Sequence, residues 1–325
     1  MPKAPILESR HTLELPLVRE EEDNICLPLV ISVVSRYWGE EIPISEAKDI
    51  AKMYPKIKGT IMIEGIELAE KHGFKSFIYK GSLQDLKKRI DQGLPPIVIL
   101  PGIQETVQHA TVISGYDDST NRVLTYFPEP DKIGAITYKQ FNELWKQDDN
   151  ITMMLVPNDM AKYVENDELM FTKSNRLCFV AEKLQMQGKR EEAVSMLVKA
   201  KDEEPENPKI WNLLGSLYND LGSEEAVRCY ERAIKLNPKY YLAYRGLGNY
   251  YLKKKGYPMA EKYYSKAIEI NPYRFGPIYK NRAIARLELG NKQAAASDFA
   301  QYLVQCPSAA DRAGVEEMVK RLSKQ

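Results

Sequence analysis

The sequence predicts an α+β domain followed by an all-α array of stacked helical hairpins. Three observations lead to this prediction. An apolar stretch long enough for a buried helix comes first, short β-rich runs separated by turn residues follow it, and glycines recur every 34 residues in the second half. Helices that precede an antiparallel sheet are typical of an α+β domain, and a fixed period of this length is typical of a repeat array. For 325 residues, about two domains are expected.

Residues 28–39, PLVISVVSRYWG, are the first element, and we predict a buried helix there. The stretch is apolar on nearly every side, and its length exceeds the roughly five or six residues of a typical strand. Pro28 stands inside the start and Gly39 past the end, which is the asymmetry expected of a helix. Cys26 is therefore expected at or just before the helix N-terminus. Further amphipathic helices are predicted at 45–54, 62–72 and 82–92.

The period then changes to that of strands. Turn signals such as DDSTN and PEPDK separate five short β-rich runs, which read PPIVIL, HATVISGY, RVLTYF, GAITY and ITMMLVP. The α+β domain is expected to span residues 1–157 and to end near Pro157. We interpret residues 158–169 as a linker and residues 170–325 as the repeat array.

The repeat array is predicted from the spacing of small residues. Small residues let two antiparallel helices approach closely, glycine turns the chain, and proline ends the second helix of each pair. About four units run from residue 170 to 307, and the tail SAADRAGVEEMVKRLSKQ is predicted to be an amphipathic capping helix. The recurring residues are Gly188, Gly222, Gly256 and Gly290, then Ala193, Ala226, Ala260 and Ala294, then Pro205, Pro238, Pro272 and Pro307.

The units resemble tetratricopeptide repeats. The first full unit carries the motif at Trp211, Leu214, Gly215, Tyr218, Gly222, Ala226, Tyr230, Ala233 and Pro238. An unrelated helical bundle is the alternative. The resemblance implies a groove that binds a protein or peptide and is lined by the first helix of each pair, with Asn212, Ser216, Asn219, Arg245, Asn249, Lys253, Tyr279 and Arg286 as lining residues.

The side chains predicted to line this groove are polar with excess positive charge. Arg and Asn can meet a carboxylate with directed hydrogen bonds, so an extended ligand that bears carboxylates would suit the groove. Solvated helix faces are also often rich in Lys and Arg, and this second interpretation stays open.

The first half resembles the papain-like peptidases that process double-glycine bacteriocin leaders. Cys26 leads a buried helix that ends in Tyr37, Trp38 and Gly39, and the motif HxxVxxGYDD begins at His109. The resemblance covers roughly residues 13–157. It implies a papain-like cysteine peptidase fold and a bacterial source, with Cys26 as nucleophile and His109 as its partner, and it implies no cofactor. The helix N-terminus favours a thiolate, and the histidine protonates the leaving amine.

Two supporting positions of this family are altered. The glutamine that donates to the oxyanion is matched by Glu20, and the orienting aspartate is matched by Phe127. A carboxylate repels an oxyanion, and a phenyl ring cannot accept from an imidazole, although Glu129 or Asp131 would substitute if their loop folds back. Loss of an oxyanion donor costs about 100- to 1000-fold in rate, and loss of the orienting residue up to about 10,000-fold.

Composition and charge exclude several classes of function. The formal net charge of +1 gives no reason to expect nucleic acid or an acidic membrane surface as partner. No apolar run of about 18 residues is present for a membrane span, and the charged N-terminal residues do not read as a secretory signal. Four cysteines and three histidines are scattered without ligand spacing, so a metal site is not expected and reduced thiols in a cytoplasm are.

Two functions are compatible with these features. In the first, the protein is a cysteine peptidase that holds a protein substrate through its repeats and cuts it at Cys26. In the second, the peptidase-like domain is catalytically degenerate, and the protein is a scaffold or adaptor. A third possibility, that the N-terminal domain only caps the repeats, leaves the expected peptide cleft unexplained and ranks last.

Overall fold

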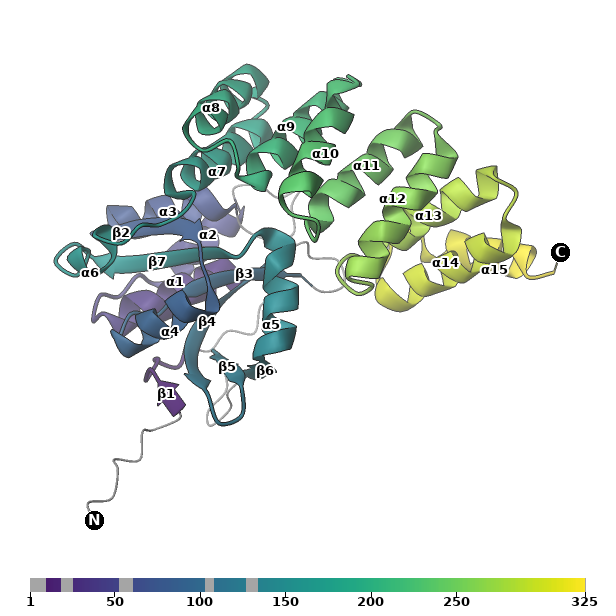
Figure 1. Cartoon of the computed structure of the whole chain (residues 1–325). Helices are drawn as coiled ribbons and strands as arrows, with labels where there is room; N and C mark the ends of the chain where they lie inside the picture. Colours follow the sequence, from purple (N-terminus) through teal and green to yellow (C-terminus); the bar gives the residue numbers. More distant parts are fainter. Residues whose placement is uncertain (1–9, 19–25, 53–60, 103–107, 127–133, 325) are drawn as a thin grey trace, which may run out of the picture. The chain divides into compact units, whose positions relative to one another are not determined.

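The computed structural model describes residues 10–18, 26–52, 61–102, 108–126 and 134–324, and it divides into two compact units (Figure 1). The first unit comprises Met1–Leu100, Ala110–Lys146 and Asn150–Phe179. The second comprises Val180–Gln325 together with two short segments of the first half, Pro101–His109 and Gln147–Asp149. The predicted fold class, an α+β domain followed by helical repeats, is confirmed.

The α+β half alternates helices and strands along the chain. Its helices are α1 (Cys26–Tyr37), α2 (Ile44–Lys52), α3 (Met62–Lys71), α4 (Leu83–Asp91), α5 (Tyr138–Trp145) and α6 (Lys162–Glu165), with a 3₁₀ turn η1 (Lys146–Asp148). Its strands are β1 (Arg10–Thr12), β2 (Phe74–Lys80), β3 (Ile97–Pro101), β4 (Gln108–Asp117), β5 (Arg122–Thr125), β6 (Gly134–Thr137) and β7 (Ile151–Pro157).

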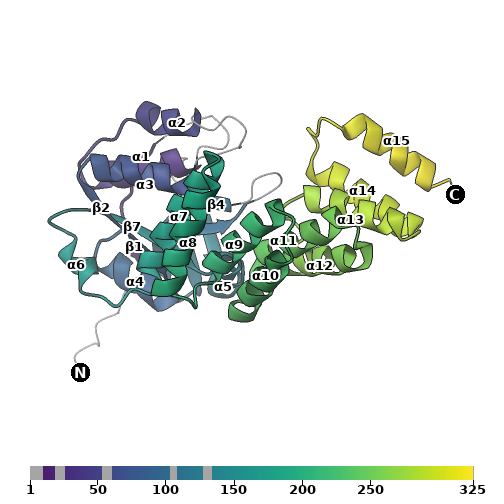
Figure 2. The same ribbon diagram turned by 90° about the horizontal axis from the view of Figure 1, so that it is seen from above.

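These strands form one seven-stranded sheet in the order β2-β7-β3-β4-β5-β6, and β1 also pairs with β4. Helices α4 and α5 pack on one face, where Leu86, Ile90, Phe141 and Trp145 join apolar residues of β3, β4 and β5. Helices α1, α2 and α3 contact one another, and the sheet lies between them and the pair α4 and α5 (Figure 2). The sheet is therefore covered on both faces.

Helix α1 lies deep in this unit. Ile31, Val33 and Val34 are fully buried, as the all-round apolar sequence predicted. On α3, Gly65 allows a close approach, because a Cβ atom there would lie only 2.6 Å from Ile31 Cδ1 and 2.8 Å from Leu27 Cδ2. The end of α1 is also fixed, since the Trp38 indole donates to the Leu155 carbonyl at 3.1 Å.

Strand β2 is one element that the sequence interpretation did not include. It pairs in antiparallel register with β7 along its whole length, from Phe74 opposite Pro157 to Lys80 opposite Ile151. Phe77, Ile78 and Tyr79 are all buried in succession. A strand covered on both faces loses the alternation of apolar and polar residues by which an isolated strand is recognised.

The repeats comprise four antiparallel helical hairpins and a last helix. They are α7 (Thr172–Met186) with α8 (Arg190–Glu203), α9 (Pro208–Asp220) with α10 (Glu225–Leu236), α11 (Tyr241–Lys253) with α12 (Tyr257–Ile270), α13 (Pro277–Glu288) with α14 (Lys292–Gln305), and then α15 (Arg312–Leu322). The boundary between the two units falls inside α7.

Glycines and tyrosines set the spacing between the hairpins. A Cβ atom on Gly215 of α9 or on Gly246 of α11 would lie within 3 Å of the Tyr230 ring of α10. Gly248 faces Tyr264 of α12 in the same way. Each ring fills a space that only a residue without a side chain leaves open, so the apolar faces are buried by stacking of neighbours.

One turn between paired helices departs from the glycine pattern. Gly188, Gly222 and Gly290 have positive φ, as expected of glycines that end a helix. In the third hairpin α11 ends earlier, so Lys255 adopts the left-handed conformation with φ of 58°. Gly256 has φ of −80° instead.

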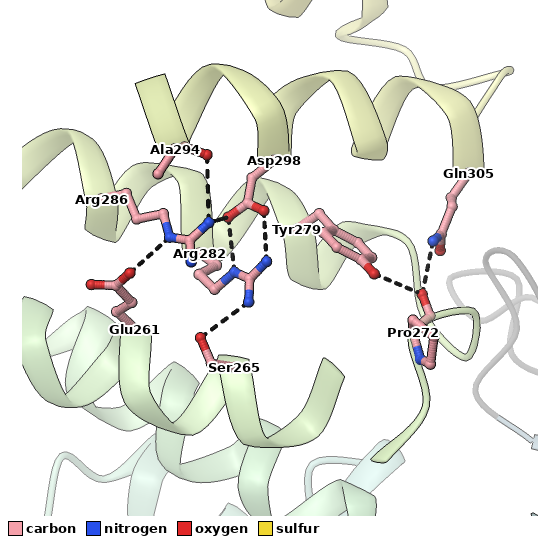
Figure 3. Close-up of polar contacts among 9 residues, drawn as sticks. All are labelled: Glu261, Ser265, Pro272, Tyr279, Arg282, Arg286, Ala294, Asp298 and Gln305. Carbon is pink, nitrogen blue, oxygen red and sulfur yellow. Dashed lines mark hydrogen bonds and ion pairs between the residues drawn. The ribbon is translucent and has the colours of Figure 1, made fainter. Parts of the chain in front are cut away.

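The last two hairpins are joined by a buried polar network (Figure 3). Asp298 of α14 is 3% exposed and accepts from two guanidinium groups. Arg282 binds it through two bonds of 2.7 and 2.8 Å, and Arg286 through one of 3.0 Å. Arg286 also pairs with Glu261 of α12 at 2.8 Å. Both positive charges are thus balanced inside the helices.

We expect the substitution Lys255→Gly to stabilise the repeats by about 0.5–1 kcal/mol. The left-handed conformation costs a residue with a side chain about 1–2 kcal/mol, and the flexibility of glycine in the unfolded chain offsets about half of this. Urea unfolding followed by circular dichroism measures the change. The matched substitution Gly290→Ala should destabilise the repeats, and a loss of stability in the Lys255→Gly variant would contradict the strain argument.

Removing the Asp298 carboxylate should destabilise the last two hairpins by about 3 kcal/mol, because two buried guanidinium groups lose a shared partner. The substitution Asp298→Ala tests this by thermal and urea unfolding. Glu269→Ala serves as control, since it breaks an exposed pair with Lys266 at 2.8 Å. An equal shift of the unfolding midpoint in both variants would show that the buried network stabilises the repeats no more than the exposed pair does.

Candidate functional site

Cys26 is the first residue of α1 and is partly buried. Its sulfur accepts from the backbone N–H groups of Cys26, Leu27 and Ala110. The first two belong to the free N–H groups that every helix presents at its N-terminus, and they favour the thiolate. Burial acts in the opposite direction and is the larger effect, so the pKa of the Cys26 thiol is raised.

Ala110 links the thiol to the strand that carries the predicted histidine. It directly follows His109 in β4 and is itself buried. The His109 side chain is exposed, and partial desolvation by the surrounding protein lowers its pKa. At neutral pH the resting groups are therefore a thiol and a neutral imidazole.

Leu27 follows the cysteine directly. Its side chain is 2% exposed and packs towards Gly65 of α3. This side chain is therefore part of the apolar core around α1.

The two altered positions of the predicted site, Glu20 and Phe127, lie outside the described residues, as do Glu129 and Asp131. Their neighbours along the chain are held together. The Tyr126 hydroxyl accepts from Val18 N–H at 2.9 Å and donates to the Val18 carbonyl at 3.3 Å.

Three residues predicted to line the groove come from α9. Asn212 is 8% exposed, and neither its Oδ1 nor that of Asn219 has a hydrogen-bond partner in the described part of the chain. Ser216 shares a hydrogen bond with Tyr230. The backbone carbonyl of Asn219 accepts from Lys253 Nζ at 3.1 Å, so α9 and α11 are joined along this face.

Arg245 of α11 is half-buried and stacks over the Phe275 ring, with 4.8 Å between its Cζ and the ring centroid. Burial lowers the pKa of this guanidinium. Within the described residues it makes no hydrogen bond or ion pair. Asn249, one turn further along α11, accepts from the Tyr264 hydroxyl at 2.8 Å.

Two residues predicted to line the groove, both from α13, bind partners inside the repeats (Figure 3). The Tyr279 hydroxyl donates to the Pro272 carbonyl at 3.1 Å. Arg286 is held by Glu261 and Asp298. Of the three cations among the eight predicted side chains, Arg286 pairs with carboxylates and Lys253 donates to a backbone carbonyl. Arg245 alone makes neither an ion pair nor a hydrogen bond within the described residues.

Comparison with known families agrees with the resemblances predicted for the two halves of the chain. Residues 12–153 match the model of the peptidase C39-like family, while residues 223–255 and 243–274 match two tetratricopeptide repeat models. The chain carries a peptidase C39-like domain followed by tetratricopeptide repeats. The resemblance predicted from the Cys26 and His109 motifs is confirmed at this level.

Similar proteins cover only parts of the chain. Human tetratricopeptide repeat protein 6 is 38% identical over 71 residues, which are 22% of this chain and 14% of the human protein. The peptidase domain of Streptococcus ComA, a bifunctional ABC transporter involved in a quorum-sensing pathway, is 24% identical with a TM-score of 0.36. It covers 44% of this chain and 98% of its own length. MamA is also 24% identical, with a TM-score of 0.38, and covers 43% of this chain and 75% of its own.

The peptidase C39-like domain and the repeats contain no group of three or more His, Cys, Asp or Glu side chains arranged for a metal ion within the described ranges. No helix in those ranges has the length and apolar character to cross a membrane. The contribution of Ala110 at the site was missed, because a backbone N–H leaves no signal in the residue type. The partner of Arg245, Phe275, lies in an inter-repeat turn that carries no motif position.

We expect Cys26 of the peptidase C39-like domain to react slowly with iodoacetamide at neutral pH. A raised pKa leaves less thiolate at a given pH, and alkylation requires the thiolate. The pH profile of labelling at Cys26, read by mass spectrometry of its peptide, should have a midpoint above that of the same cysteine in the urea-unfolded chain. Rapid labelling near pH 6 would contradict this and would indicate an activated nucleophile.

Proposed function

We propose that this protein is an adaptor that binds an extended, carboxylate-bearing segment of another protein through its repeats. The observation that carries the proposal is the half-buried guanidinium of Arg245, which has no charged partner among the described residues. Family membership supports the coarser part, since the chain joins a peptidase-like domain to repeats of a type used in protein interaction.

The charge and hydrogen-bonding groups on α9 and α11 define the ligand. A partly desolvated cation is stabilised when a carboxylate supplies charge-assisted hydrogen bonds, and the ring of Phe275 already restricts the orientation of the guanidinium. Asn212 and Asn219 each retain a side-chain oxygen without a partner in the described residues. Both oxygens are buried within the repeats, so each amide would have to turn outward to accept a backbone N–H group of an extended peptide.

The neutral state of the thiol supports the degenerate interpretation of the peptidase-like domain. Burial raises the pKa of Cys26, and the positions for the oxyanion donor and the orienting carboxylate carry Glu20 and Phe127. Each change opposes thiol catalysis independently. The four cysteines form no disulfide bond in the described part of the chain, which supports a reducing, cytoplasmic compartment for this protein.

A cysteine peptidase is the second candidate function. It is favoured by the position of Cys26 at the N-terminus of α1, where its sulfur receives three backbone N–H groups. In that case the repeats would hold the substrate, and His109 would supply the proton to the leaving amine. The pH profile of Cys26 labelling separates this candidate from the adaptor.

The groove proposal is tested with decapeptides selected from a displayed random library against the full-length protein. We expect the selected peptides to be rich in Asp and Glu, and Arg245→Ala to weaken their binding about 10-fold or more, because a hydrogen bond to a charged group contributes roughly 1.5–3 kcal/mol. Fluorescence anisotropy measures the affinity. Changing each acid of the peptide to its amide should identify the carboxylate coupled to Arg245.

The matched control is Arg228→Ala, which removes an exposed arginine of α10 that pairs with Glu225 at 2.7 Å. It should leave peptide binding unchanged. Equal losses in the two variants, or selected peptides without acidic enrichment, would refute the proposed groove.

A further inference from the structure

Side chains of the repeats form hydrogen bonds and an ion pair with three consecutive residues that lie outside the repeat helices. Residues 147–149 belong to the second unit, and each is at most 4% exposed. The Gln147 Oε1 atom accepts from Asn271 Nδ2 at 3.2 Å. The Asp149 Oδ1 atom accepts from Asn237 Nδ2 at 3.0 Å. Alternate residues of this short segment are therefore bound by asparagines that lie one repeat apart.

The two asparagines are prepared for this contact by their place in the repeat. Asn237 and Asn271 directly follow the second helices, α10 and α12, and each precedes a proline. The Oδ1 atom of each accepts from the backbone N–H two residues later, at Lys239 and Tyr273, both at 3.0 Å. Because Oδ1 is fixed inside the turn, the Nδ2 group points outward as a donor with a set direction.

Asp148, the central residue, carries the strongest contact. Its Oδ1 atom lies 2.8 Å from Arg274 Nη2, and neither side chain has any exposed surface. The same oxygen accepts from Gln108 Nε2 at 2.7 Å. Arg274 also stacks over the Tyr241 ring at 4.7 Å. A fully buried ion pair persists only when its geometry and extra hydrogen bonds compensate for the lost hydration.

The backbone at the end of this segment adopts a conformation that is rare for residues with side chains. Asp149 and the next residue, Asn150, both have positive φ, at 56° and 57°. Asp and Asn adopt this conformation more readily than other residues with side chains, but two in succession still carry a cost that the surrounding contacts must offset.

Gln108 connects this network to the candidate site. It is the first residue of β4, and His109 and Ala110 follow it. Within the first unit, the N–H of Ala110 donates to the Cys26 sulfur. The chain of contacts thus runs from Arg274 through Asp148 to Gln108, and then two residues along β4 to the group that binds the thiol.

We propose that Arg274 is a positioning residue of the repeats that fixes the start of β4, and with it His109 and the Ala110 N–H beside Cys26, through Asp148 and Gln108. These contacts hold whether Cys26 is a nucleophile or a buried thiol of an adaptor. The proposed positioning role of Arg274 therefore does not depend on whether a peptide binds in the groove at Arg245.

The test is amide hydrogen exchange of the full-length chain, read by mass spectrometry on peptides that cover residues 108–112. Arg274→Met and Gln108→Ala should each raise exchange of these amides at least about 10-fold, and should change the rate of Cys26 labelling by iodoacetamide at least about 3-fold. Exchange in β2 and β7 should stay the same.

The control Arg282→Met breaks a different buried ion pair of the repeats, that with Asp298 at 2.7 Å. It should lower the melting temperature without changing exchange at 108–112. If Arg274→Met leaves these amides protected, or if Arg282→Met exposes them equally, Arg274 has no positioning role. If Arg274→Met does not fold, Gln108→Ala decides alone, because it keeps the ion pair intact.

The double substitution Asp148→Leu with Arg274→Met separates positioning from stability. Replacing both charges leaves no unpaired buried ion, so the melting temperature should return towards that of the unmodified protein. Exchange at 108–112 should stay fast, because Gln108 still lacks its acceptor. Recovery of both properties together would overturn the proposal.

Discussion

The burial of helix α1 is the constraint on which the first unit and the chemistry of Cys26 both depend. Full burial of a large aliphatic side chain contributes about 1.5–3 kcal/mol, and α1 supplies several, including Ile31, Val33 and Val34. The same packing removes water from the first turn. The N–H groups there favour a thiolate, but desolvation is the larger effect and raises the pKa of Cys26. A helix that anchors the domain this firmly therefore holds its cysteine in the neutral form, and activation would need a further charge near the sulfur.

The buried and half-buried arginines in the described part of the repeats fall into two groups, those paired with a carboxylate and one that is not. Asp298 balances Arg282 and Arg286, and Asp148 balances Arg274, so these cations are structural. Arg245 differs, since the described residues offer it an aromatic ring and no anion. These other buried arginines of the repeats are paired with carboxylates. A carboxylate from an external ligand would give the half-buried guanidinium of Arg245 the same kind of partner. This contrast gives the proposed groove a local physical basis beyond the excess positive charge of the residues predicted to line it.

Local periodicity made much of this fold predictable. The 34-residue spacing predicted the hairpins, and the all-round apolar sequence predicted α1, because both patterns arise within one element or one repeat. Strand β2 was missed because its pairing with β7 joins distant residues, from Lys80 with Ile151, 71 positions apart, to Phe74 with Pro157, 83 positions apart, and both faces are covered. Cys26 and His109 were predicted from motifs and their roles stay a prediction, whereas the direction of the thiol pKa depends on packing that no motif encodes. The contact between Asp148 and Arg274 spans 126 positions and follows no spacing rule.

Buried charge is a poor source of stability, and this bears on why the segment 147–149 is polar. An apolar segment of similar volume would bury as well or better, because the desolvation of Asp148 and Arg274 offsets much of their attraction. Polar groups add hydrogen bonds, which require a donor and an acceptor in a defined direction. Gln147, Asp148 and Asp149 each have a donor at a separate place on the repeats, and shifting the segment by one residue would leave a buried carboxylate without its partner. We infer that the network selects a single register for the segment, and that the same register sets where β4 begins.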